Sequence, residues 1–129
     1  MKNRSKLGLI AAGWLVAFTA VAHHSTAFNY NRDSIISVEG IVTEYKFQNP
    51  HVQVSLDVET EAGETVVWLV ELAAKNQYLR MGWTGDEFQA GQMIKVSAWE
   101  GYRPRTAYMR TAIMPDGNEI NTAPNLPGR

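Results

Sequence analysis

The chain of 129 residues contains no cysteine and only three histidines, and what is missing narrows the chemistry it can carry. Without cysteine there is no disulfide, no thiol nucleophile and no cysteine to carry a lipid anchor. The sequence also shows no Ser-His-Asp order, no glycine-rich phosphate loop, no paired catalytic carboxylates and no internal repeat. It therefore gives no sign of the common nucleophilic or nucleotide-binding sites.

No apolar run is long enough to span a membrane. The longest, residues 7–22, has 16 residues, whereas a membrane-spanning helix needs about 20. A basic start precedes this run, which ends in Ala-Val-Ala at residues 20–22. The pattern predicts a secretory signal peptide over residues 1–22, cleaved after Ala22, and a periplasmic protein without a stable membrane anchor. An uncleaved anchor and a cut after Ala27 are the less well matched alternatives.

The charge balance lacks an excess of positive residues. Removal of residues 1–22 takes three of the 12 Lys and Arg and none of the 13 Asp and Glu, so nine basic residues face 13 acidic ones and the net charge is −4. Binding to a phosphate backbone needs clustered positive charge. We therefore expect no nucleic-acid partner, and the sequence identifies no protein partner.

The remaining residues suffice for one small domain. Residues 23–34 show no clear period and are expected to form an irregular arm. Residues 35–121 are expected to form a β-barrel domain, because β-branched and alternating segments dominate them. Residues 122–129 contain two prolines and a glycine and are expected to be a flexible tail.

The clearest strand lies at residues 51–59, where apolar and polar side chains alternate strictly. Residues 65–72 follow after a glycine-containing turn and carry a second apolar face. Pairing the two apolar faces sets an antiparallel register in which Glu71 lies opposite Gln53 and diagonal to His51. The sequence thus predicts that Glu71 and His51 share one outer face of a hairpin.

The order of the elements indicates the fold. Besides the hairpin, we expect strands at 35–47, 93–100 and 108–114, a short helix at 73–80, and a short sixth strand after a Pro-Asp-Gly turn at 115–117. Three strands, a helix and two or three further strands predict a mostly β, five- to six-stranded antiparallel barrel that is OB-like, with the helix between strands 3 and 4. Such barrels have many unrelated activities, so the fold does not give the function.

The three histidines are the candidate metal ligands. Cleavage after Ala22 would make His23 the first residue, whose α-amino group has a pKa of about 7.7–8.0 and can lose its proton to a metal at neutral pH. The amine and Nδ1 of His23 would close one chelate ring, an arrangement that resembles the histidine brace of copper proteins. His51 would supply a third nitrogen, and His24 would bind directly or help exclude solvent.

A planar set of three or four nitrogens favours Cu(II), and zinc is the alternative metal. In the absence of metal binding, His23 and His24 are solvated residues after a cleavage site, and His51 is a solvent-facing strand residue. The two interpretations stay open on the sequence alone.

Glu71 is the candidate for orienting His51. Its strand is apolar on both faces, so a carboxylate there needs a partner. A carboxylate that holds a metal-binding imidazole in one tautomer is a common arrangement. The alternatives are that Glu71 ends its strand in water or pairs with Arg80.

Two further groups of side chains are placed to contact ligands. Three arginines lie in or beside a predicted loop: Arg103, Arg105 and Arg110. We expect them either to recognise an anion or to form a solvated rim of the barrel. Three tryptophans are expected in the core: Trp68, Trp83 and Trp99. The second interpretation is that they form a surface on which a ligand stacks.

Five short motifs follow one another along the chain. They are His-His-Ser at 23–25, Asn-Pro-His at 49–51, Trp-x-x-Glu at 68–71, Gly-Trp at 82–83 and Pro-Asp-Gly at 115–117. With these motifs the chain resembles a family of small exported bacterial proteins of unknown function, over nearly the whole mature domain. One departure is Phe47-Gln48, where the family would have a tryptophan at one position. The resemblance implies export and one compact domain, and it carries no established activity.

The sequence thus predicts a periplasmic metal-binding protein for copper handling or delivery, with His23 and His51 as ligands. His24 would be a fourth ligand, and Glu71 would orient His51. The main alternative is a metal-free OB-like module for ligand binding or assembly. A copper-dependent oxidase is less favoured, because the small domain offers no obvious substrate face, and no catalytic residue is assigned.

Overall fold

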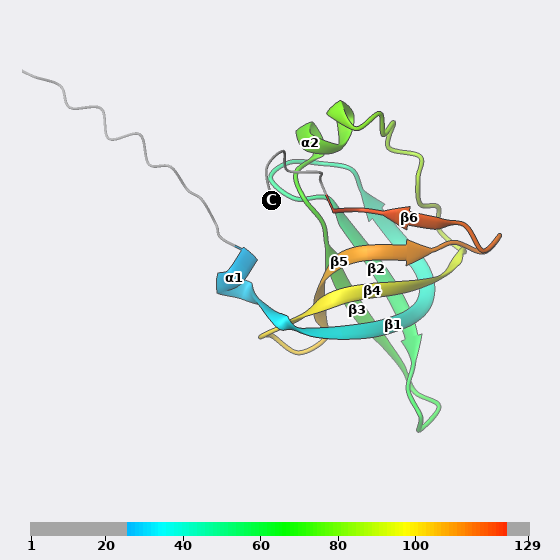
Figure 1. The fold of residues 1–129 in the computed structure, drawn as a ribbon. Coiled ribbons are helices and arrows are strands. Elements are labelled where there is room, and N and C mark those ends of the chain that lie inside the picture. Colours follow the sequence, from blue (N-terminus) through cyan, green and yellow to red (C-terminus); the bar gives the residue numbers. More distant parts are fainter. Residues whose placement is uncertain (1–25, 124–129) are drawn as a thin grey trace, which may run out of the picture.

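Six strands and two short helices follow one another in residues 26–123, the part of the chain that this computed structural model describes (Figure 1). They are α1 (Thr26–Asn29), β1 (Tyr30–Lys46), β2 (Gln53–Glu59), β3 (Thr65–Glu71), α2 (Lys75–Arg80), β4 (Met93–Gly101), β5 (Thr106–Ile113) and β6 (Glu119–Asn121). Within these residues no helix is both long and apolar enough to cross a membrane. The expected leader, residues 1–22, lies outside the described residues.

The strands form one closed sheet. Their order is β3-β2-β1-β4-β5-β6, and a parallel pairing of β3 with β5 closes the barrel. All other neighbouring strands are antiparallel. A short helix, α2, separates β3 from β4. The prediction of a mostly β, OB-like barrel with one short helix between strands 3 and 4 is confirmed.

β1 is long enough to pair on both sides and to bend around the barrel (Figure 1). Its first part pairs with β4 and its last part with β2. At Gly40 a Cβ atom would lie 2.5 Å from the carbonyl oxygen of Asp57, so the close approach of β1 to β2 requires glycine there. The register shifts between Val42 and Glu44, which moves the apolar side chains to the other parity beyond that point.

The first and last segments of the described chain are more ordered than the sequence indicates. Of the expected irregular arm, residues 30–34 already belong to β1, and a register irregularity between Asn31 and Ile35 hides the strand period there. At the other end, Thr122 is fully buried and its amide donates to the carbonyl of Arg110. The first residue of the expected tail is therefore held by the barrel. Residues 124–129 lie outside the described range.

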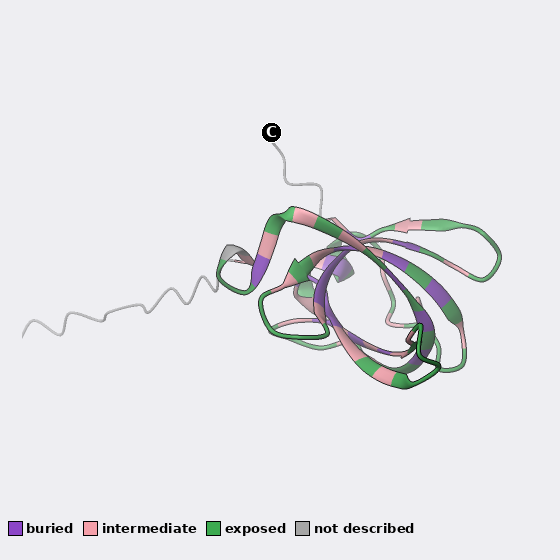
Figure 2. Cartoon of the chain, turned by 90° about the horizontal axis from the view of Figure 1, so that it is seen from below, coloured by how far each residue is buried: buried purple, intermediate pink, exposed green. Residues whose placement is uncertain are grey.

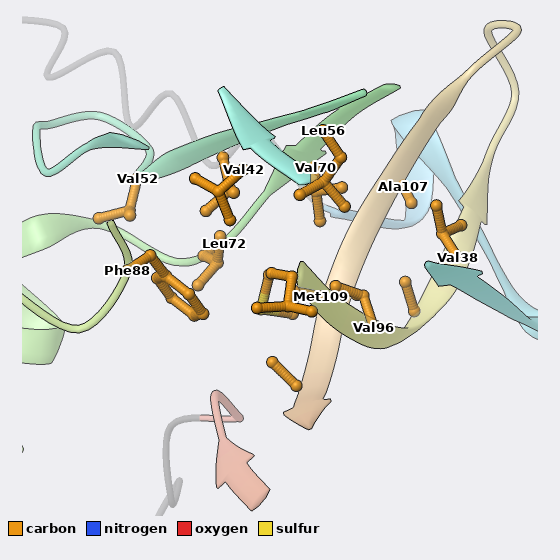
Figure 3. Close-up of a cluster of buried hydrophobic side chains, with 14 of the residues drawn as sticks. Val38, Val42, Val52, Leu56, Val70, Leu72, Phe88, Val96, Ala107 and Met109 are labelled. Carbon is orange, nitrogen blue, oxygen red and sulfur yellow. The ribbon is translucent and has the colours of Figure 1, made fainter. Parts of the chain in front are cut away.

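The core fills the inside of the barrel. Seen from below, the strands form a closed ring along which buried positions alternate with exposed ones (Figure 2). Inward residues of β1 to β5 and of the segment after α2 meet in one apolar cluster, shown in Figure 3, that includes Val42, Val54, Leu56, Val70, Phe88, Val96 and Met109. Trp68 and Trp83 pack against this cluster, as expected, whereas Trp99 lies outside it.

The loop between β1 and β2 is held against the end of β3 and the start of α2. The amide of Val52 donates to the carbonyl of Ala73, and the amide of Leu72 donates to the carbonyl of Val52. Asn49 accepts a hydrogen bond from the amide of Asn76 through its side-chain oxygen. These contacts fix the backbone on both sides of His51, the loop residue of greatest chemical interest.

Candidate functional site

Glu71 is the last residue of β3, and its side chain faces outward between two inward neighbours, Val70 and Leu72. It pairs with Gln53, in the register that the hairpin pattern predicts. Although it faces outward, Glu71 is only 9% exposed. A carboxylate at that depth requires polar partners, and the structure supplies two.

The first partner is His51. Its Nδ1 lies 3.5 Å from Oε2 of Glu71, and its side chain is 29% exposed. The diagonal relation predicted from the hairpin register therefore brings the imidazole and the carboxylate together. The alternative partner, Arg80, forms no ion pair with Glu71 in the described part of the chain.

The second partner is Tyr30, which the sequence analysis missed. Its hydroxyl donates a 2.5 Å hydrogen bond to Oε2 of Glu71, and the residue is only 2% exposed. Burial and the hydrogen bond to Glu71 raise the pKa of Tyr30 well above its ordinary value. No local signal marks this residue, because it lies in the stretch without a period.

Aromatic rings extend the site along the outer surface of the barrel. The ring of Tyr30 packs on that of Tyr108 with centroids 5.4 Å apart, and Tyr108 stacks on Trp99 at 5.6 Å. Tyr108 is paired with both Glu71 of β3 and Trp99 of β4. The seam at which β5 joins β3 and β4 therefore carries a continuous row of aromatic and carboxylate side chains.

His23 and His24, the other predicted ligands, lie outside the described residues. Between residues 26 and 123 no group of three or more His, Cys, Asp or Glu is arranged to hold a metal ion. Within that range the structure brings together His51 and Glu71, and the role of all four residues in metal binding stays a prediction.

Solved structures of similar fold include two crystal structures of Rim1, a mitochondrial single-stranded DNA binding protein of S. cerevisiae. One is 13% identical, with a TM-score of 0.47, and the match covers 70% of this chain and 96% of that one. The other is 12% identical, with a TM-score of 0.46, and the match covers 70% and 97%. A search of curated proteins gave no match.

One expectation from the sequence, that no nucleic acid is a partner, is corrected. A nucleic-acid partner was excluded on the net charge of −4, yet the similar chains are named as single-stranded DNA binding proteins. Net charge is a sum over the chain, whereas recognition depends on where charges lie. In the structure, Arg32 and Arg110 lie against one ring, that of Trp99, so positive charge is locally concentrated. The exclusion on net charge is therefore withdrawn, and at identities of 13% and 12% the partners of these neighbours are not carried over to this chain.

Family membership rests on a match over most of the chain, including the hairpin with His51 and Glu71. The match covers residues 13–110, and by it the chain belongs to the family of unknown function DUF6152.

Proposed function

We propose that the chain is exported, is cleaved after Ala22, and binds one copper ion for handling or delivery. The amine and imidazole of His23 and the imidazole of His51 are the ligands, and His24 is the fourth ligand. The observation that carries the proposal is the contact between Nδ1 of His51 and the buried carboxylate of Glu71.

This contact suits a metal-binding imidazole. A carboxylate beside Nδ1 favours the tautomer in which Nδ1 carries the proton and Nε2 carries the lone pair. The partial exposure of the His51 side chain leaves the imidazole accessible to a ligand from outside the barrel. Glu71 is itself fixed by the hydroxyl of Tyr30, so the orientation of His51 is supported by two layers of contacts.

The chain between His23 and Tyr30 is short enough for the predicted new terminus to reach this site. Two residues separate His23 from Thr26, and α1 then leads directly into Tyr30. At about 3.5 Å per extended residue and 1.5 Å per helical residue, His23 is at most roughly 17 Å along the chain from Tyr30. Tyr30 and His51 both contact Oε2 of Glu71. The segment that leads from His23 to Tyr30 therefore ends beside the imidazole of His51.

The donor set selects the metal. Three or four nitrogens in a plane match the geometry that Cu(II) prefers, and Cu(II) also leads the divalent series in affinity for such donors. Zinc is the alternative, because it accepts the same imidazoles in a tetrahedral arrangement.

One structural feature favours the second candidate, a metal-free ligand-binding or assembly module. An open cleft of about 420 Å³ lies between β1 and the β2–β3 hairpin, with Trp68, Val58 and Ile36 among its lining residues. An apolar floor with polar groups at the rim is typical of binding sites for small ligands. Copper binding by the mature protein separates the two candidates.

The test compares Cu(II) affinity, measured by calorimetry, for the protein that begins at His23 and for a variant with one glycine added before His23. The added residue removes the amine from the His23 chelate, so we expect a loss of affinity of at least about 10-fold. His51→Ala should show a loss of similar size. Gln53→Ala, on the same hairpin face, is the matched control and should bind as the unchanged protein does.

Two outcomes would contradict the proposal. Equal Cu(II) affinity with and without the added glycine would exclude the amine of His23 as a ligand. Mass spectrometry of the exported protein that places its first residue anywhere other than His23 would remove the amine from the site altogether.

A further inference from the structure

Three side chains from adjacent strands meet on the outer surface of the barrel: Arg32 of β1, Trp99 of β4 and Arg110 of β5. The guanidinium carbon of Arg110 lies 4.3 Å from the centroid of the Trp99 ring, and that of Arg32 lies 4.7 Å from it. Both distances are typical of cation–π contacts. These three residues are called the Arg–Trp–Arg cluster below.

The contacts with Trp99 hold both guanidinium groups without using their hydrogen-bond donors. A guanidinium that stacks flat on a ring keeps its five N–H donors in its own plane, directed away from the ring. In residues 26–123 the ion pairs are Lys46–Glu44 and His51–Glu71, and neither includes Arg32 or Arg110. Within the same residues, the side chains of Arg32 and Arg110 donate no hydrogen bond. Their N–H donors are therefore available to an external ligand.

Charges of both signs surround the cluster. Two carboxylates near it accept hydrogen bonds, Glu71 from Tyr30 and Glu100 from Ser34, and Glu100 also lines the cleft near Trp68. A third cation, Arg103, is close enough to oppose the rise in the pKa of Tyr30 that burial causes.

The same field acts on Tyr108. Burial and the negative charge of Glu71 raise the pKa of Tyr108, and the positive charges of Arg110 and Arg32 oppose that rise. Tyr30 therefore lies within reach of the positive charge of Arg103, and Tyr108 within reach of those of Arg32 and Arg110.

We propose that the Arg–Trp–Arg cluster is a binding site for an oxyanion group, a phosphate or a carboxylate, held by the outward N–H donors of Arg32 and Arg110. The planar fork of arginine matches the two oxygens of such a group. Because Trp99 already restricts both side chains, binding costs less conformational entropy than it would for two freely moving arginines. Its residues differ from the proposed copper ligands, and its binding does not depend on copper.

The experiment titrates the mature chain with inorganic phosphate and, separately, with acetate, at constant ionic strength and with a chelator present. The signal of the Trp99 indole N–H in NMR spectra reports binding at the cluster. We expect a saturable shift of that signal, with affinity reduced about 10-fold or more in Arg32→Gln and in Arg110→Gln, as loss of a charge-assisted hydrogen bond predicts. Arg110→Lys keeps the charge but loses the fork, and it should also weaken binding.

Lys95→Gln is the matched control, since Lys95 is an exposed cation on β4 and its removal changes the net charge by the same amount. Its affinity should equal that of the unchanged chain. Saturation with phosphate alone identifies a phosphate-bearing ligand, and saturation with acetate alone identifies a carboxylate. Absence of a saturable shift with both anions, or an equal loss in Lys95→Gln, would overturn the proposal.

Discussion

The hydroxyl of Tyr30 donates a 2.5 Å hydrogen bond to Oε2 of Glu71, and this contact joins the first residue of β1 to the last residue of β3. It covers the carboxylate of an outward-facing strand position, which is why Glu71 is buried outside the core. The same oxygen faces Nδ1 of His51. One carboxylate therefore ties the entry of the chain into the barrel to the orientation of an imidazole.

Replacement of Tyr30 by phenylalanine should lower the free energy of unfolding by about 1–3 kcal/mol, because it leaves the buried carboxylate of Glu71 without its hydroxyl donor. The change in the midpoint of urea denaturation measures this loss. Tyr102→Phe is the control, since that ring is 65% exposed, and it should leave the midpoint unchanged. Equal midpoints for Tyr30→Phe and the unchanged protein would show that the hydrogen bond adds no net stability.

Glu71→Gln should lower Cu(II) affinity about 10- to 100-fold, as is usual when a carboxylate behind a metal-binding imidazole is removed. Calorimetry of the mature protein provides the measurement, and Glu39→Gln, an exposed carboxylate of β1, is the control. If the unchanged protein binds copper and Glu71→Gln binds it equally well, Glu71 has no orienting role. If the unchanged protein binds no copper, the proposed function itself is refuted.

Alkaline pH should destabilise the protein through its buried tyrosines. Burial raises the pKa of four of them above the ordinary value: Tyr30, Tyr45, Tyr78 and Tyr108. Above about pH 10 the unfolded chain loses phenol protons that the folded chain keeps, so unfolding releases protons and the free energy of unfolding falls as the pH rises. Below about pH 10 this contribution is fully present.

Urea midpoints measured across this pH range, together with tyrosinate absorbance, provide the check. Tyr78→Phe removes one of the four groups and should make the decline with pH shallower. A free energy of unfolding that stays constant through pH 10 and above, with tyrosinate forming in the folded protein, would contradict the assignment.

Gly40→Ala should lower the free energy of unfolding by about 1–3 kcal/mol, a typical cost of overpacking. The added Cβ would lie 2.5 Å from the carbonyl oxygen of Asp57 and 2.9 Å from a methyl group of Val58, so the β1–β2 pairing must shift. Ser37→Ala, at an exposed position of the same strand, should have little effect. Thermal unfolding of the two variants side by side tests the difference, and equal midpoints would contradict the prediction.

The sequence is most informative where burial follows a short period. The alternation in residues 51–59 and 65–72 predicts the hairpin register, and the structure pairs Gln53 with Glu71 accordingly. The approach of His51 to Glu71 follows from that register together with the contacts that hold the loop before β2, because His51 is diagonal to Glu71 and precedes the paired residues.

The sequence is least informative in the first and last segments of the described chain. Residues 30–34 lack a period because the register is irregular between Asn31 and Ile35, and Thr122 is buried through hydrogen bonds to β5. Both features arise from contacts with distant strands. No window of neighbouring residues contains them.

The sequence by itself determined the alternating core, the hairpin and the site of the short helix, because each depends on the spacing of side chains along one segment. Only the tertiary structure placed Tyr30 over Glu71 and set Arg32 and Arg110 against Trp99. The first contact links β1 to β3, which are not adjacent in the sheet, and the others link β1 and β5 to β4, which lies between them. Barrel closure, which no local pattern encodes, therefore creates the outer surface to which we assign both proposed sites.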